Sequence, residues 1–74
     1  MNQASNSIRV EIYDQTYHLR GTDPEYVQRL AEYVDGKMRQ VAAQTATIDS
    51  LRLAVLAALN IADELQVVRG KYDN

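Results

Sequence analysis

Apolar and polar residues alternate near the start of the chain, a pattern of period two that is typical of β-strands with one buried face. The alternation pauses at an Asp-Gln pair and then resumes, which predicts a β-hairpin over residues 8–20. The residues before it, 1–7, are rich in Asn, Ser and Gln, and we expect them to be disordered. The alternating apolar residues are Ile8, Val10, Ile12, Tyr17 and Leu19.

The period then changes to that of a helix. Asp23, Pro24 and Glu25 form a strong helix start, with a capping oxygen, a proline at the first helical position and an acid in the first turn. Apolar residues then recur at spacings of three and four, which predicts an amphipathic helix over residues 24–43. Gly36 lies inside this helix and should cost about 1 kcal/mol relative to Ala. The apolar positions are Val27, Leu30, Ala31, Val34, Met38 and Val41.

A second helix is predicted from about residue 50 to at least residue 68, with Asp49 or Ser50 as its cap. Its apolar residues alternate in spacings of three and four, which is the heptad pattern of a coiled coil. The chain is therefore expected to divide into a head, residues 8–49, and a dimerisation helix that begins a coiled coil, residues 50–74. The heptad positions are Leu51, Ala54, Ala58, Ile61, Leu65, Val68 and Tyr72.

The second helix is apolar around its whole circumference over residues 53–62, where Asn60 is the only polar side chain. Such a helix is buried on all sides. One hairpin and one amphipathic helix cannot cover every face, so we expect a second copy of the chain to cover the rest. The predicted dimer interface consists of Leu51, Ala54, Val55, Ala58, Leu59, Asn60, Ile61, Ala62 and Leu65.

Two interpretations of Asn60 remain open. A buried amide must find hydrogen-bond partners or cost about 1 to 3 kcal/mol. It can set the register of a helix interface, as buried Asn does in coiled coils. It can also be a core amide that bonds to the backbone of its own chain.

Length and composition favour self-association. The chain has 74 residues, no cysteine and one histidine. A domain of this size buries a small fraction of its surface and usually needs a disulfide, a metal or a partner. Disulfides are excluded, and the lone His18 without cysteine neighbours does not predict a metal site. Oligomerisation is the remaining source of stability, and we expect no metal and no cofactor.

The charge balance limits the partners. The formal net charge of −2 argues against nucleic acid or an anionic membrane as the main partner, because both select for basic surfaces. No stretch reaches the length of about 18 consecutive apolar residues that a membrane span needs. We therefore expect a soluble, cytoplasmic protein.

Nothing in the sequence points to catalysis. His18 lies on the outward face of a predicted strand, with Arg9 or Glu11 as a cross-strand neighbour, and we interpret it as a surface histidine. Asp63 and Glu64 are adjacent, so they do not share one helix face as paired carboxylates would. The sequence thus predicts a protein that is not an enzyme.

Basic residues form either a surface for an acidic partner or a solvated face of mixed charge. Acidic residues are interspersed among them, so both interpretations stay open. The basic residues concerned are Arg9, His18, Arg20, Lys37, Arg39 and Arg52.

Several segments resemble one family. Ala57-Ala58-Leu59-Asn60-Ile61-Ala62-Asp63-Glu64-Leu65 resembles the AALNIA-x-EL signature of the ZapA family of cell-division proteins. Val34-Asp35-Gly36-Lys37-Met38-Arg39 is similar to the family's VDEKMRE segment, with Gly36 in place of the usual Glu. In the hairpin, Asp14 replaces a common turn glycine and Gln15 a common basic residue. The resemblance covers residues 8–65.

The resemblance implies an α+β fold in which a β-hairpin and two helices form a homodimeric head domain. It implies dimerisation around the second helix, and a longer helix of this kind pairs dimers into an antiparallel tetramer. It further implies a non-catalytic scaffold that binds and cross-links FtsZ filaments at the midcell Z-ring. The alternative is a dimeric interaction module that recruits another division or envelope protein. The candidate residues for binding FtsZ are Arg20, Lys37, Arg39 and His18.

Overall fold

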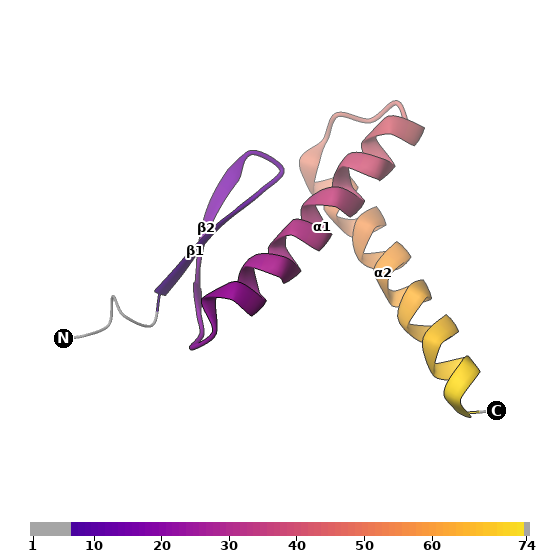
Figure 1. The fold of residues 1–74 in the computed structure, drawn as a ribbon. Helices are drawn as coiled ribbons and strands as arrows, with labels where there is room; N and C mark the ends of the chain where they lie inside the picture. Colours follow the sequence, from indigo (N-terminus) through magenta and orange to yellow (C-terminus); the bar gives the residue numbers. More distant parts are fainter. Residues whose placement is uncertain (1–6, 74) are drawn as a thin grey trace. The chain divides into compact units, whose positions relative to one another are not determined.

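An antiparallel β-hairpin and two α-helices follow one another along the chain in the computed structural model, which describes residues 7–73 (Figure 1). The strands are β1, Ser7–Ile12, and β2, Gln15–Arg20. The helices are α1, Pro24–Gln44, and α2, Ser50–Asp73. The predicted α+β class and element order are confirmed. The predicted disorder concerns residues 1–6, which lie outside the described residues, and Ser7, which instead begins β1.

The hairpin turns through two residues with a left-handed backbone. Tyr13 and Asp14 have φ of 51° and 66°, which is the geometry of the two-residue turns that match the twist of antiparallel strands. The resulting register places Ile8 opposite Leu19 and Val10 opposite Tyr17. Directly opposite side chains share one face of a hairpin, so the predicted apolar face is formed as expected.

Each helix is capped by the aspartate that directly precedes its first residue. The Asp23 carboxylate accepts a hydrogen bond from the backbone N–H of Tyr26 at 3.1 Å. Asp49 accepts one from the backbone N–H of Leu51, also at 3.1 Å. Each bond satisfies a backbone donor that has no partner within its own helix. The structure therefore selects Asp49 over Ser50 as the cap of α2.

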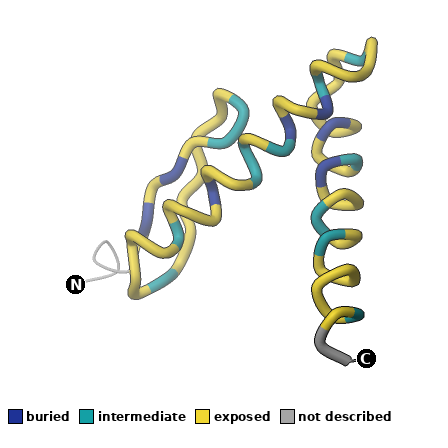
Figure 2. Tube along the Cα trace, turned by 45° about the vertical axis from the view of Figure 1, so that its right-hand side comes forward, coloured by how far each residue is buried: buried dark blue, intermediate teal, exposed yellow. Residues whose placement is uncertain are grey.

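The chain consists of two compact units that divide inside α1, at Met1–Gly36 and Lys37–Asn74. In the first unit, the hairpin packs on the first part of α1 through Ile8, Val10 and Ala31, which are all buried (Figure 2). The predicted division into a head and a dimerisation helix at residue 50 concerns function and stays a prediction.

The second unit joins the last part of α1 to α2. Its buried residues are Met38 and Val41 of α1 together with Leu53 and Ala57 of α2. Leu53 and Ala57 are four residues apart and so lie on one side of α2. This side is the core face of α2, and it leaves the rest of the helix circumference to other contacts.

Candidate functional site

The side of α2 that faces away from its core face is apolar and exposed. Leu51, Val55 and Leu59 follow one another at spacings of four, and their exposed fractions are 72%, 53% and 62%. We call these three residues the α2 ridge. Large apolar side chains grouped in this way on a small protein mark an interaction surface.

A second row of residues runs beside the ridge, about a quarter turn around the helix. It consists of Ala54, Ala58, Ile61 and Leu65, which we call the α2 seam. Three of these are exposed and Ile61 is half-buried. The small alanine side chains leave room for another helix backbone to approach closely. The ridge, the seam and Ala62 account for the predicted dimer interface except Asn60, and all of them but the half-buried Ile61 are exposed in the single chain.

Asn60 lies on another side of α2. It follows Ala57 by three residues and precedes Glu64 by four, so helix geometry places it with the core face. Its side chain is nevertheless exposed in the single chain, which differs from the expectation of a core amide within its own chain. Its place in a dimer interface stays a prediction.

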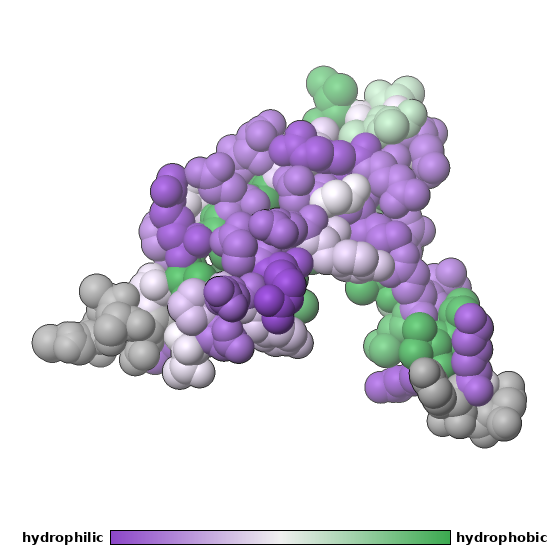
Figure 3. Space-filling view, in the orientation of Figure 1, coloured by the Kyte–Doolittle hydropathy of each residue, from purple (hydrophilic) through white to green (hydrophobic). Residues whose placement is uncertain are grey.

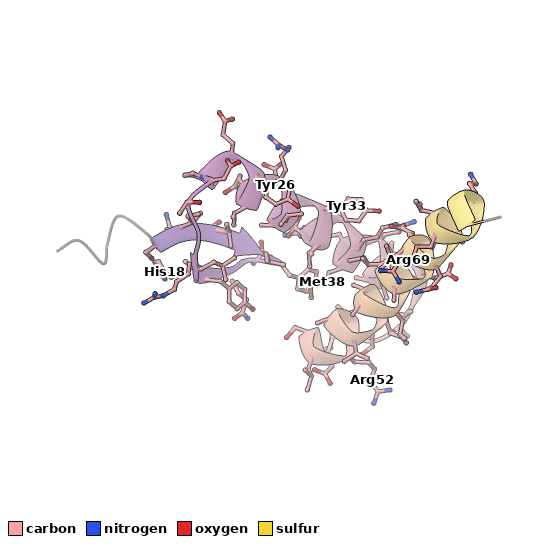
Figure 4. The ribbon with its side chains drawn as sticks, turned by 90° about the horizontal axis from the view of Figure 1, so that it is seen from below. His18, Tyr26, Tyr33, Met38, Arg52 and Arg69 are labelled. Atoms are coloured by element: carbon pink, nitrogen blue, oxygen red, sulfur yellow. The ribbon has the colours of Figure 1, made fainter. Side chains whose placement is uncertain are left out.

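The candidate basic residues fall into separate groups. His18 and Arg20 lie on β2, where His18 pairs across the hairpin with Arg9 of β1. Residues two apart on a strand share a face, so Arg9, His18 and Arg20 form the hairpin basic face (Figure 4 labels His18). Glu11 shares this face and forms an ion pair with Arg9 at 3.0 Å. The hairpin face therefore has mixed charge with a basic excess.

Lys37 and Arg39 lie on α1 within the second unit. Residues two apart on a helix point to different sides, so these two cations do not form one patch with each other. Lys37 forms an ion pair with Glu64 of α2, and only 17% of its side chain is exposed. Lys37 thus has a structural role between the two helices that sequence reasoning missed.

An exposed aromatic stripe runs along α1. Tyr26 and Tyr33 are seven residues apart, lie along the same side of the helix and are each 51% exposed (Figure 4). The guanidinium of Arg29 lies 5.9 Å from the centre of the Tyr26 ring, within range of a cation–π interaction. The seven-residue spacing was visible in the sequence, but it does not say which side of α1 the hairpin covers.

The loop between the helices carries one very exposed apolar residue. Ile48 is 94% exposed and lies three residues before Leu51 of the ridge. Figure 3 shows apolar surface at this loop and on the C-terminal half of α2. Periodicity could not identify Ile48, since it lies between two periodic segments.

Other types of site find no support in the part of the chain that the structure describes. Residues 7–73 contain no cluster of three or more His, Asp or Glu side chains able to hold a metal ion. None of the described helices is long and apolar enough to cross a membrane.

Comparisons with known proteins agree on one family. The family described as "Cell division protein ZapA" matches residues 8–74. A cell division protein ZapA from Geobacillus sp. (strain WCH70) is 35% identical over 72 residues, which cover 96% of this chain and 83% of that protein. The corresponding protein of Pseudomonas aeruginosa is 40% identical over 63 residues, covering 82% of this chain and 61% of that protein.

Two solved structures share the fold. A conserved bacterial protein of unknown function from Pseudomonas aeruginosa PAO1 has a TM-score of 0.80 at 34% identity, covering 93% of this chain and 78% of that chain. A structure described as a ZapA mutant dimer from Geobacillus stearothermophilus has a TM-score of 0.71 at 31% identity, covering 99% and 86%. The matched segment includes the hairpin, both helices and the exposed side of α2, and on this evidence the chain belongs to the ZapA family of cell-division proteins.

Proposed function

We propose that this protein is a non-catalytic scaffold of bacterial cell division that binds FtsZ filaments and cross-links them through self-association. The observation that carries the proposal is the exposed apolar side of α2. The ridge and seam give each chain a surface that water solvates poorly, and a second copy covers it. Two heads joined in this way present two filament-binding faces.

Family membership and the fold support self-association. One solved relative is described as a ZapA dimer, and its fold matches this chain over 99% of its length. A chain of 74 residues also gains much of its stability from a partner. With a longer helix of the same pattern, the coiled coil would pair dimers into tetramers.

The hairpin basic face supports contact with an acidic partner. His18 and Arg20 are exposed residues of β2, His18 lies opposite Arg9 of β1, and Arg39 is exposed on α1. Lys37 is the weaker candidate, since only 17% of its side chain is exposed. Function then depends on valency, because two linked weak sites hold a filament longer than one site does. The proposed location is the cytoplasm at the midcell Z-ring.

The experiment is co-sedimentation with polymerised FtsZ of the same organism. We expect the protein to pellet with filaments and binding to weaken as salt rises, since exposed charges are screened. Replacing Arg20 and Arg39 with Glu should reduce binding strongly, with Arg69→Glu and Lys71→Glu together on α2 as the control that changes the net charge equally. Unchanged binding of the double variant would show that another face is used. No binding by the wild-type chain would favour the alternative, a dimeric module that recruits another division or envelope protein.

A further inference from the structure

The only histidine of the chain, His18, lies among fixed charges on the hairpin. The strand register places His18 directly opposite Arg9, and Arg20 follows two residues later on β2. The Cβ atoms of directly opposite residues in an antiparallel pair are about 5 Å apart, and residues two apart on a strand share a side. His18 therefore has a cation as its cross-strand neighbour.

The side of the hairpin that carries His18 faces away from α1. The hairpin packs on α1 through Ile8 and Val10, which alternate with Arg9 along β1 and so lie on the opposite side. His18 is exposed, as is every residue of β2, so a partner molecule can reach its imidazole. The strand residues on this outer side are Ser7, Arg9, Glu11, Thr16, His18 and Arg20.

Three of these outer residues carry fixed charges, and His18 is the one whose charge can change near neutral pH. Arg9 forms an ion pair with Glu11 at 3.0 Å, so these two charges largely cancel for a distant partner. Histidine is the side chain that ordinarily gains or loses its charge between about pH 5 and pH 8. Protonation of His18 thus adds a full positive charge to a face with few others.

We propose that His18 makes the hairpin basic face a pH-sensitive site, which binds a carboxylate-bearing partner segment more tightly when the imidazole is protonated. A protonated imidazole donates from both ring nitrogens and forms charge-assisted hydrogen bonds with a carboxylate. Like charges directly opposite each other on a hairpin repel, and a carboxylate between Arg9 and protonated His18 removes this repulsion. Because linkage is reciprocal, binding of the acidic segment should be accompanied by proton uptake. The proposal rests on the contact with an acidic partner proposed above and adds its regulation.

Binding of poly-L-glutamate tests this regulation without FtsZ. The peptide keeps its negative charge at about pH 6 and at about pH 7.5, because the ordinary pKa of glutamate is about 4.3. Histidine ordinarily loses most of its charge between these two pH values. We expect the wild-type chain to bind fluorescently labelled peptide about two- to fivefold more tightly at the lower pH, which is the effect of one exposed ion pair. Fluorescence anisotropy at low salt measures the dissociation constants.

Two substitutions of His18 serve as matched controls, because each keeps one charge state at both pH values. His18→Gln stays neutral and should bind about as weakly at either pH as the wild type does at about pH 7.5. His18→Lys stays positive and should bind about as tightly at either pH as the wild type does at about pH 6. Since His18 is exposed, both variants should keep the fold, which circular dichroism verifies.

The proposal is overturned if the wild type binds poly-L-glutamate equally at both pH values, or binds it at neither. It is also overturned if His18→Gln keeps the pH dependence of the wild type, since another group then titrates. Failure of the proposed function gives a different result. A chain that does not co-sediment with FtsZ contradicts the scaffold function alone, whereas equal peptide binding at both pH values contradicts the role of His18 alone.

Discussion

The carboxylate of Asp35 accepts a hydrogen bond from the backbone N–H of Tyr13, with 2.6 Å between the nitrogen and Oδ1. Tyr13 is the first of two consecutive non-glycine residues at positive φ. Such a backbone costs about 1 to 2 kcal/mol per residue in a left-handed helix and persists when its surroundings hold it. The bond fastens the hairpin turn to α1 within the first unit.

Removing the hydrogen bond between Tyr13 and Asp35 should destabilise the fold. Asp35→Ala leaves the half-buried Tyr13 N–H without its carboxylate, and we expect the free energy of unfolding to fall by about 1 to 3 kcal/mol. Urea unfolding at fixed protein concentration measures the change. Glu32→Ala, an exposed acidic position three residues earlier on α1, serves as the control and should change stability little. If both substitutions lower the free energy of unfolding equally, the hydrogen bond of Asp35 does not stabilise the turn.

Replacing Gly36 and Gly21 by alanine should change the stability of the protein in opposite directions. A Cβ at Gly36 meets no atom within 4 Å, so Gly36→Ala should stabilise the protein by about 1 kcal/mol through helix propensity. A Cβ at Gly21 would lie 3.0 Å from Cδ1 of Ile8, so Gly21→Ala should lower stability through crowding of the first core. Thermal unfolding of both variants gives the comparison. A loss of stability in Gly36→Ala would mean that a partner chain approaches Gly36.

The ion pair between Lys37 and Glu64 should contribute to the second unit. Because the Lys37 side chain is mostly buried, we expect a coupling of about 1 kcal/mol between the two residues. A double-mutant cycle with Lys37→Met and Glu64→Gln measures it. Additive effects of the two substitutions would show that the pair does not stabilise the fold.

Substitutions of Asn60 test whether the dimer interface includes this residue. The single chain leaves it exposed, so a carboxylate there should be tolerated within one chain. If the partner covers it, Asn60→Asp introduces two buried carboxylates per symmetric dimer and should lower dimer stability by several kcal/mol. Asn60→Leu should be as stable or more stable, with looser specificity of association. A fully dimeric Asn60→Asp at neutral pH would place Asn60 outside the interface.

Local sequence patterns predicted the elements of this fold well. The alternation through Val10, the cap at Asp23 and the helical spacing after it each depend on neighbours in the chain, and the corresponding elements formed. The helix ends differed by one residue at Gln44, where the last turn depends on packing as well as on sequence. The choice between Asp49 and Ser50 required the structure, because both side chains can cap a helix.

Contacts between distant residues were less predictable. Sequence spacing does not show that Lys37 reaches Glu64 or that Asp35 reaches Tyr13, because each pair depends on how separate elements pack. The exposure of Leu30, at 49%, has the same origin, since periodicity identifies an apolar stripe but not how much of it one hairpin covers. For this reason the basic candidates divided into a hairpin group with His18 and two separate cations on α1.

The decisive measurement for the proposed dimer is the dependence of thermal unfolding on protein concentration, recorded together with mass in solution. If the exposed side of α2 is covered by a second copy, the midpoint rises with concentration and the mass is twice 8.4 kDa. A midpoint independent of concentration, together with the mass of one chain at micromolar concentration, would show that no second copy covers this side of α2.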